Sequence, residues 1–528
     1  MTERHGQALY ERFLRGLVLS PDRPAVSSGS DALTYRETHQ LALGWAGALL
    51  ALSAKAGTPD PTAVGVLAGR GIAGYVGVLA ALYTGAAVVP LNPGFPAARL
   101  REMIDLAGVS ASLADAEGLA ALAAMADDAP RLPVLPIGAR TRGEAPPESA
   151  LREPRPVDPD AVAYLLFTSG STGRPKGVPI RHSSAWHYFE LLDRRYRFAA
   201  DDAFSQTFDL NFDCAMFDLF CAWGSGARLV HIPAQRYRDL PEYLTAQQVT
   251  VWFSTPSAIT LVRRMSGLAP ASMPTLRWSF FAGEALRCAD ADAWQVAAPG
   301  AALENLYGPT EATVTITSHR WDPVRSMALS VDGLVPIGAL HRGHEAMLLR
   351  DNEIHADEGE LCITGPQLTA GYLDPADNAG RFLRRDGMTW YRTGDRVRRL
   401  ELGQFAYLGR LDSQVQVNGW RVELAEVEHA VCGCPGVEQA IAVPRTTDGS
   451  IEIVVFYTGT PMDPAMLGRL LRPVLPHGML PRDFRHLAEL PLNGNRKTDR
   501  RTLAGLAAAR PEFPAGSPGK PRNSAVNP

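Results

Sequence analysis

The chain has 528 residues, of which 46% are hydrophobic and 20% are charged, and its formal net charge at pH 7 is −4. This length predicts about two or three domains with sizeable cores, and the composition is typical of a globular protein. The small negative charge argues against nucleic acid or an anionic membrane surface as a partner.

The cysteines and the apolar stretches argue against a secreted or membrane protein. The six cysteines show no disulfide or zinc spacing, so we expect free thiols in a reducing compartment. The charged N-terminus lacks the apolar segment of a signal peptide. Residues 75–91 form the most apolar stretch, but glycines interrupt it, which favours a core helix and strand over a membrane span. We therefore expect a cytoplasmic protein.

The first part of the chain alternates between strand and helix patterns. Short apolar runs separated by segments of helical period are typical of βαβ units and a parallel sheet. A linker rich in proline, arginine and glutamate, residues 139–159, separates two such series. The expected elements are strands at 62–68, 86–89 and 109–113 with helices at 72–83 and 97–106, and then strands at 227–232, 249–254 and 276–281.

The pattern changes after about residue 334, where short strands and turns predict a smaller β-rich subdomain. Beyond Arg410, residues 414–424 predict a hairpin that turns at Asn418-Gly419. A compact α+β domain follows from helices at 424–431 and 464–471 and strands at 437–443 and 451–457. The final residues are rich in proline, glycine and serine, and we expect them to be disordered.

An anion-binding loop follows the apolar run 163–167. Its small residues leave backbone N–H groups exposed, and its hydroxyls and lysine can contact phosphate oxygens. The Walker spacing is absent, which excludes a P-loop phosphotransferase, and a plain surface loop is the alternative interpretation. Only four of the 52 basic residues are lysines, and two of them, Lys176 and Lys497, lie in motif-like stretches. The candidate phosphate-binding residues are Thr168, Ser169, Gly170, Ser171, Thr172, Gly173 and Lys176.

Five motifs in a fixed order resemble the adenylate-forming superfamily, and within it the amino-acid adenylation domains of nonribosomal peptide synthesis. They are FTSGSTGRPKG (167–177), NLYGPTEAT (305–313), YRTGD (391–395), GRLDSQVQVNGWRVELAEVE (409–428) and NGNRKTDR (493–500). The resemblance implies a large α/β N-terminal domain, built from two doubly wound α/β subdomains and a β-barrel-like one, with a small, mobile α+β C-terminal domain. We expect the core at 1–410, the mobile lid at 411–505 and a disordered tail at 506–528.

The resemblance also implies a reaction in two halves, in which ATP and Mg²⁺ convert an amino acid to aminoacyl-AMP and a thiol then accepts the acyl group. Catalysis would consist of positioning and charge neutralisation, because a carboxylate must approach a polyanion. Glu311 would bind Mg²⁺, Thr310 and Lys497 would contact the α-phosphate, and Asp412 would act as the hinge. The nucleotide would lie against Tyr307, Gly308, Asp395 and Arg410. The family has glycine before the lysine, where this chain has Arg496.

The same residue types also have structural explanations. Asp395 and Asp412 could serve only as turn residues, and Glu311 could be a favourable acid at a helix N-terminus. Tyr307 could belong to the core.

An aspartate early in a helix would bind the ammonium group of the substrate in amino-acid-activating relatives, and Asp213 matches it. Asp209 and Asp218 lie close by, and a shift of register would select one of them, for example for a β-amino acid. The remaining pocket positions match Cys214, Phe217, Ser257, Phe280, Ala282, Leu306, Val314 and Thr315. They carry no charge, so we expect a small or medium neutral α-amino acid such as proline, valine, alanine or threonine.

No stretch resembles a carrier or condensation domain, so we expect a free-standing enzyme that loads the phosphopantetheine arm of a separate carrier protein. One alternative is an acyl- or aryl-CoA ligase, although such an enzyme has no use for Asp213. A second alternative is a non-catalytic binding protein, which would not need Lys176, Glu311, Asp395 and Lys497.

Overall fold

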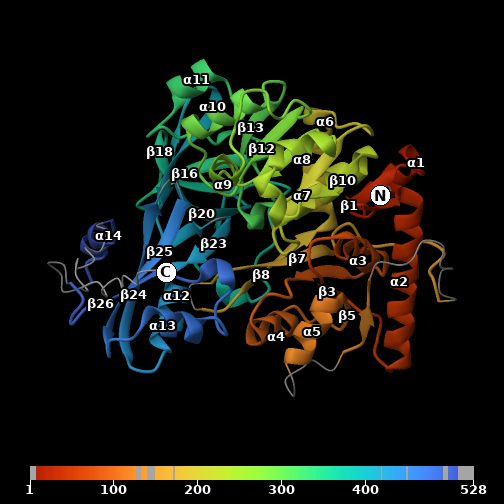
Figure 1. The fold of residues 1–528 in the computed structure, drawn as a ribbon, viewed down its shortest axis with the longest axis horizontal. Helices are drawn as coiled ribbons and strands as arrows, with labels where there is room; N and C mark the ends of the chain where they lie inside the picture. The colour runs from red at the N-terminus through yellow and green to blue at the C-terminus, as the bar shows by residue number, and fades with distance from the viewer. Residues whose placement is uncertain are drawn as a thin grey trace, which may run out of the picture.

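The computed structural model describes residues 7–125, 132–138, 149–170, 173–417, 419–447, 450–491 and 498–508. Two large sheets with the helices that cover them form the larger part of the molecule, and a smaller C-terminal unit lies against them (Figure 1). The large α/β part and the smaller α+β part confirm the expected fold class.

The first sheet has six strands in the order β6-β5-β3-β4-β7-β8. All neighbours are parallel except β8, which returns antiparallel to β7 across the candidate phosphate loop. The strands are β3 (Ala63–Leu67), β4 (Ala87–Leu91), β5 (Ala111–Ala114), β6 (Val134–Pro136), β7 (Val162–Thr168) and β8 (Lys176–Arg181). The helices of this part are α2 (Tyr35–Lys55), α3 (Ile72–Tyr83), α4 (Ala97–Leu106) and α5 (Ala116–Ala124). The predicted strands and helices of the first series are therefore confirmed.

The second sheet has fifteen strands and joins two kinds of structure. Its parallel part runs β13-β12-β11-β9-β10-β1, so the chain's first strand lies beside β10. These strands are β1 (Pro24–Ser28), β9 (Ala203–Gln206), β10 (Arg228–His231), β11 (Val251–Ser254), β12 (Trp278–Phe281) and β13 (Ala302–Tyr307), with β2 (Asp31–Thr34) antiparallel at the edge. The accompanying helices are α1 (Glu11–Leu19), α6 (His182–Tyr196), α7 (Asp213–Ser225), α8 (Leu240–Ala246), α9 (Ser257–Met265), α10 (Cys288–Ala297) and α11 (Pro323–Leu329).

Antiparallel strands extend this second sheet from β13 onwards, and those after residue 334 form the predicted β-rich subdomain, while β14 precedes it. They are β14 (Thr317–Arg320), β15 (Gly338–Leu340), β16 (Glu345–Arg350), β17 (Glu353–His355), β18 (Glu358–Thr364), β19 (Phe382–Arg385), β20 (Met388–Arg399) and β21 (Gln404–Arg410). Asp395 on β20 pairs with Arg410 on β21 in this ladder, so the register of two strands brings two candidate site residues together.

The C-terminal unit begins with the hairpin β22 (Gln414–Val417) and β23 (Trp420–Glu423), which confirms the predicted hairpin on either side of Asn418, itself outside the described residues. The sheet β24-β25-β26 and three helices follow. Their bounds are α12 (Leu424–Cys432), β24 (Val437–Thr447), β25 (Ser450–Gly459), α13 (Pro464–Leu471), β26 (Asp483–His486) and α14 (Arg500–Ala508). The tail was predicted to begin at residue 506, but α14 continues to Ala508 and buries Ala507; residues 509–528 lie outside the described residues.

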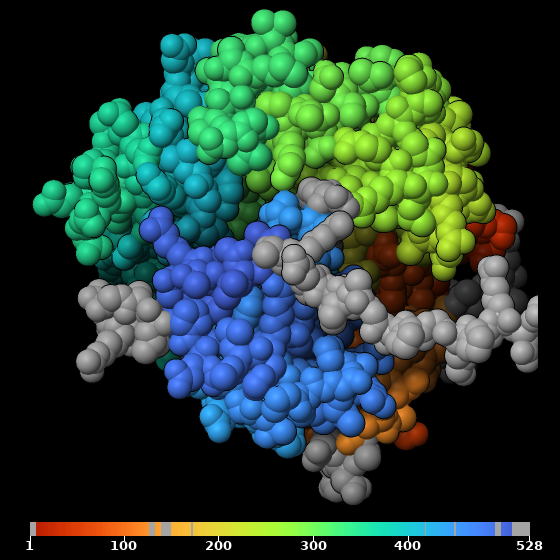
Figure 2. All heavy atoms as spheres, turned by 60° about the vertical axis from the view of Figure 1, so that its left-hand side comes forward, coloured from red at the N-terminus to blue at the C-terminus, as the bar shows by residue number. Residues whose placement is uncertain are grey.

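The hydrophobic core is divided in the same way. One large cluster lies between the two α/β sheets and includes residues of α2, α3, α6 and α7. The C-terminal unit has clusters of its own, around Val422, Val455 and Leu471 and around Phe456 and Leu503. Figure 2 shows this unit, in blue, seated between the green and orange parts of the molecule.

Candidate functional site

A cavity of about 380 Å³ opens where the two α/β parts meet the C-terminal hairpin. Strands β7, β9, β11, β12 and β13 all end beside it, so the loops after these strands form most of its wall. The carboxyl ends of parallel strands are where α/β sheets bind ligands. The hairpin contributes Gln416, Gly419, Trp420 and Arg421, and the 3-10 turn His477–Met479 contributes Met479.

The candidate phosphate loop lies at one end of this cavity. Thr168 and Ser169 line the cavity, while Ser171 and Thr172 lie outside the described residues. A side chain on Gly170 would collide with the Arg174 carbonyl, and Gly173 has a φ of +81°, so the tight turn requires both glycines. The Lys176 ammonium lies 3.2 Å from Asp377 and 5.4 Å from the centre of the Tyr372 ring.

Tyr307, Asp395 and Arg410 meet at the cavity wall. The Tyr307 hydroxyl donates to Asp395 at 2.6 Å, and Arg410 donates to the other Asp395 oxygen at 2.8 Å. Burial raises the pKa of Asp395, although Arg410 and Tyr307 act in the opposite direction. A Cβ on Gly308 would lie 2.6 Å from the Thr315 Cα, so only glycine fits between these backbones. The three side chains predicted to hold a nucleoside therefore form one connected group.

Glu311 lies behind the cavity rather than on its wall, and its side chain is fully buried. The Tyr372 hydroxyl donates to it at 2.6 Å, and Arg421 Nη1 donates to Oε2 at 3.0 Å. Burial alone would raise the pKa of Glu311, but Arg421 and Tyr372 outweigh it and hold that pKa below its usual value. Arg421 was not predicted from the sequence, because an arginine in a strand of alternating pattern gives no sign of its partner.

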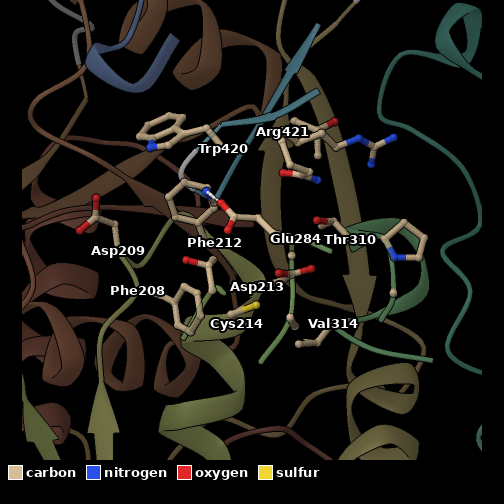
Figure 3. Close-up of a pocket in the computed structure, with 18 of the residues that line it drawn as sticks. Phe208, Asp209, Phe212, Asp213, Cys214, Glu284, Thr310, Val314, Trp420 and Arg421 are labelled. Atoms are coloured by element: carbon tan, nitrogen blue, oxygen red, sulfur yellow. Dashed lines mark hydrogen bonds between the residues drawn. The ribbon is translucent and has the colours of Figure 1, made fainter. Parts of the chain in front are cut away.

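Asp213 is the first residue of α7, and its carboxylate points into the cavity (Figure 3). Burial raises the pKa of Asp213 to about 6, against the lowering effect of the Thr310 and Cys214 hydrogen bonds. Among the described residues no cation pairs with this carboxylate. It is thus available to a positively charged ligand.

The two neighbouring aspartates occupy different environments. Asp209 lies at the cavity rim, where Arg70 Nε approaches within 3.0 Å and Asn92 donates at 3.1 Å. Asp218 is fully buried in α7 and does not line the cavity, and burial raises its pKa well above the usual value. Neither carboxylate is as free to bind a ligand in the cavity as Asp213.

The other predicted pocket positions divide into two groups. Cys214, Ala282, Leu306 and Val314 line the cavity. Phe217 and Phe280 instead pack against each other in the core, with ring centres 5.3 Å apart, and Thr315 bonds the Tyr188 hydroxyl at 2.9 Å. The Ser257 amide donates to Glu284 at 2.8 Å, and its hydroxyl lies 2.9 Å from that of Thr255. The second group, Phe217, Ser257, Phe280 and Thr315, lies behind the cavity surface.

The hairpin closes the cavity from above (Figure 3). The Trp420 ring lies 5.0 Å from that of Phe212 and 5.8 Å from that of Phe95, measured between centres. The Gly419 N–H donates to Glu284 at 2.6 Å. At the predicted hinge, Asp412 accepts bonds from Arg410 at 2.7 Å and from Arg381 at 3.2 Å. Lys497 lies outside the described residues.

Two further properties bear on ligands. No group of three or more histidine, cysteine, aspartate or glutamate side chains within the described ranges could hold a metal ion by itself. The same part of the chain contains no helix with the length and apolar character of a membrane span.

A family model for AMP-binding enzymes matches residues 17–373. Among curated proteins, the L-proline--[L-prolyl-carrier protein] ligase of Streptomyces coelicolor is 32% identical and covers 94% of this chain and 96% of its own length. Enterobactin synthase component F of Shigella flexneri and of Escherichia coli is 31% identical over 95% of this chain, and the chain spans 39% of the length of these relatives.

Solved structures give the same picture. The crystal structure of IdnL7 is 54% identical, has a TM-score of 0.72, and covers 95% of this chain and 99% of its own. The adenylation domain AlmE of Vibrio cholerae was solved with glycyl-adenosine-5'-phosphate. It is 27% identical with a TM-score of 0.81, and the match covers 96% of this chain and 98% of AlmE.

Proposed function

Because this chain belongs to the AMP-binding enzyme family, we propose that it activates a small or medium neutral amino acid with ATP and transfers it to the phosphopantetheine thiol of a carrier protein. The observation that carries this proposal is the free Asp213 carboxylate, in one cavity with Thr310 and the Tyr307–Asp395–Arg410 group. That arrangement offers an ammonium site beside a nucleoside site. AlmE, which was solved with an aminoacyl adenylate, supports the same ligand chemistry.

In the first half of the reaction, a carboxylate oxygen of the amino acid attacks the α-phosphorus of ATP, and the bond to the bridging oxygen of pyrophosphate breaks. Asp213 would hold the ammonium group and so orient the carboxylate. Thr310, next to Asp213 in the structure, would contact the α-phosphate. Asp395 and Arg410 would bind the ribose hydroxyls, and the loop that ends in Lys176 would hold the departing phosphates. Lys497 would neutralise charge at the α-phosphate.

A divalent cation fits this site only if its ligands come partly from the protein and partly from the substrate phosphates. Mg²⁺ is held in many nucleotide enzymes by one or two carboxylates together with substrate phosphates, so a complete protein cage is not needed. Glu311 is the carboxylate that would hold it, once Arg421 has moved away. The cation would neutralise negative charge that develops on the phosphates.

The depth of the cavity favours a small substrate. Phe217 and Phe280 fill the space behind Cys214 and Ala282, so the cavity does not extend into the aromatic core. Leu306 and Val314 add apolar surface at the same end. A short neutral side chain fits these apolar walls, against which a charged one would lose its hydration.

In the second half, the sulfur of the carrier thiol attacks the acyl carbon, AMP leaves with the bonding electron pair, and the thiol proton passes to solvent. We propose that residues 411–505 form a lid that pivots at Asp412 between the two halves. The separate cores of this segment support the proposal. IdnL7 has the higher sequence identity but the lower TM-score against this structure, compared with AlmE. A different position of the lid in IdnL7 would explain why its TM-score is lower.

Isotope exchange between ATP and pyrophosphate, measured against a panel of amino, aryl and fatty acids, tests this function. We expect exchange with small neutral amino acids only. In Asp213→Ala, the rate of exchange that depends on the amino acid should fall at least a hundredfold. Lys497→Ala should lose adenylation, while Glu242→Gln on the exposed face of α8 should behave as the unaltered protein. Exchange with aryl or fatty acids, or with no acid at all, would contradict the proposal.

A further inference from the structure

Three histidines gather where helix α6 meets the turn between β15 and β16. His187 belongs to α6, and His341 and His344 are the two ends of the turn, in which the His344 N–H donates to the His341 carbonyl at 3.3 Å. The ring centres of His187 and His344 lie 5.7 Å apart. The His341 ring stacks on that of Tyr188 at 6.3 Å. The proposed function uses none of these histidines.

The rings of His187 and His344 use their nitrogens in the same way. His344 Nδ1 donates to the His341 carbonyl at 3.3 Å, and its Nε2 is buried with no hydrogen-bond partner among the described residues. His187 forms a hydrogen bond with the Arg342 backbone. Because His187 Nε2 is also buried without a partner in the described part of the chain, Nδ1 is the atom that donates. Each ring is thus fixed through Nδ1–H to a backbone carbonyl and keeps an unused lone pair on Nε2.

Unpartnered atoms of this kind are informative because buried polar groups are nearly always satisfied, and a missing partner points to a water molecule or an ion. The His344 side chain is tightly packed, since a Cβ on Gly365 would lie 2.4 Å from its Cδ2. Donation of Nδ1–H to a carbonyl is the arrangement that orients a histidine for metal binding through its other nitrogen. Two such rings side by side resemble half of a metal site.

Burial also keeps the two rings in the form that binds metal ions. It lowers the pKa of His344 to about 4. It lowers the pKa of His187 as well, although the Arg342 backbone and Glu190 act in the opposite direction. A neutral imidazole binds a metal ion without first losing a proton, so binding at pH 7 would cost no deprotonation.

The spacing and the surface position of the pair allow an ion to enter. Two imidazoles bound to one ion, at about 2.0–2.1 Å for each bond, have ring centres roughly 4.5–6 Å apart, and the observed separation falls in this range. Gly343 is exposed and has a φ of +89°. A Cβ there would lie 3.7 Å from His187 Nε2, so this glycine leaves the nitrogen uncovered by any side chain of its own.

We propose that His187 and His344 bind one divalent transition-metal ion, such as Zn²⁺ or Ni²⁺, through their Nε2 atoms, with water completing the coordination. Imidazole suits these ions, whereas Mg²⁺ prefers the carboxylate and phosphate oxygens expected at Glu311. With two protein ligands the site would be weaker than a structural zinc site with four. The ion would tie α6 to the turn before β16. This inference does not rest on the proposed function.

Calorimetric titration of the full chain with Zn²⁺ alone, without ATP or an amino acid, tests the site. His187→Ala and His344→Ala should each weaken the affinity for Zn²⁺ at least tenfold, because either change removes one of only two protein ligands. Zn²⁺ should raise the melting temperature of the unaltered protein and lose this effect in both variants. A large excess of Mg²⁺ should not displace the bound Zn²⁺.

Two control variants remove other groups that could bind Zn²⁺. His477 is an exposed histidine of the C-terminal unit, and Cys432 is an exposed thiol. His477→Ala and Cys432→Ser should leave the affinity unchanged. X-ray absorption at the zinc edge should show scattering from two imidazoles. If His344→Ala failed to fold, His187→Ala would decide the question, since His187 is only partly buried.

Equal affinity in the unaltered protein and in folded His187→Ala would overturn the inference. Absence of Zn²⁺ binding to the unaltered protein would overturn it too, and would assign the two Nε2 atoms to ordered water. Neither result bears on amino-acid activation, so failure of this site and failure of the proposed function can be told apart.

Discussion

At the scale of single residues, Asp213 shows how burial prepares a carboxylate for a cationic ligand. Its raised pKa of about 6 means that burial disfavours the ionised carboxylate, which a cationic ligand would stabilise. Glu311 is the opposite case, because Arg421 already neutralises it. The two carboxylates are both near Thr310, yet among the described residues only Glu311 is paired with a cation.

We predict that Asp213→Asn stabilises the unliganded protein. Because the folded-state pKa lies above the ordinary value of 3.8, ionisation destabilises the fold as pH rises from about 4 to about 6, and the penalty is constant above that. The variant should gain about 1–3 kcal/mol at pH 7.5 and nothing below pH 4. Denaturant unfolding across this pH range measures the difference. An equal effect at all pH values would show that burial of the charge is not its origin.

At the scale of elements, helix α7 positions the site through its packing as well as through its first residue. Near its C-terminal end, Gly224 lies directly against the Arg12 guanidinium, and a Cβ there would collide with it. Arg12 is 2% exposed, donates to the Phe220 carbonyl at 2.8 Å and pairs with Asp193 at 2.8 Å. The glycine thus lets a buried arginine join α1, α6 and α7.

We predict that Gly224→Ala destabilises the protein by about 2–4 kcal/mol, because displaced Arg12 would leave a buried charge pair broken. Helix propensity alone predicts the opposite sign. Gly468→Ala in α13 is the control, since nothing lies within 4 Å of a Cβ there, and it should stabilise by about 0.5–1 kcal/mol. Thermal or denaturant unfolding of both variants decides between the two effects. A stabilised Gly224→Ala protein would mean that Arg12 moves aside without cost.

At the scale of the whole molecule, ion pairs and the packing of Trp420 against Phe212 and Phe95 join the C-terminal unit to the core, whereas each part has its own apolar clusters. Arg421–Glu311, Arg99–Glu426 and Arg381–Asp412 join the two parts. Charges in such buried pairs need a replacement partner when the pair separates, whereas a shared apolar core would have to be exposed to water. Separate apolar cores would allow the C-terminal unit to change its position on the core without unfolding either part.

We therefore predict that a chain ending at Arg410 keeps a cooperatively folded core. Calorimetry of the full chain should show at least two transitions, and the shortened chain should retain the one that belongs to residues 7–410. Loss of all cooperative unfolding after truncation would show that the two parts fold as one unit.

Several features of the site could be predicted from the sequence because they depend on local chemistry. The loop after β7, the strand ends at Tyr307 and Asp395, and the hairpin around Gly419 all carry their signals within a few adjacent residues. The wall positions Phe217, Phe280 and Thr315 could be aligned with the family motif, but their side chains turn into the core, which depends on how α7 and β12 pack.

The sequence by itself determined the alternating elements and the order of the motifs, because spacing and residue type act locally, whereas Asp213 was a candidate by resemblance with Asp209 and Asp218 as alternatives. Only the tertiary structure decided that Arg421 rests on Glu311 and that Glu426 pairs with Arg99. These pairs join residues 110 or more positions apart, and their geometry depends on where a separately folded unit docks. The state of the site is therefore a property of the assembled domains and not of any one motif.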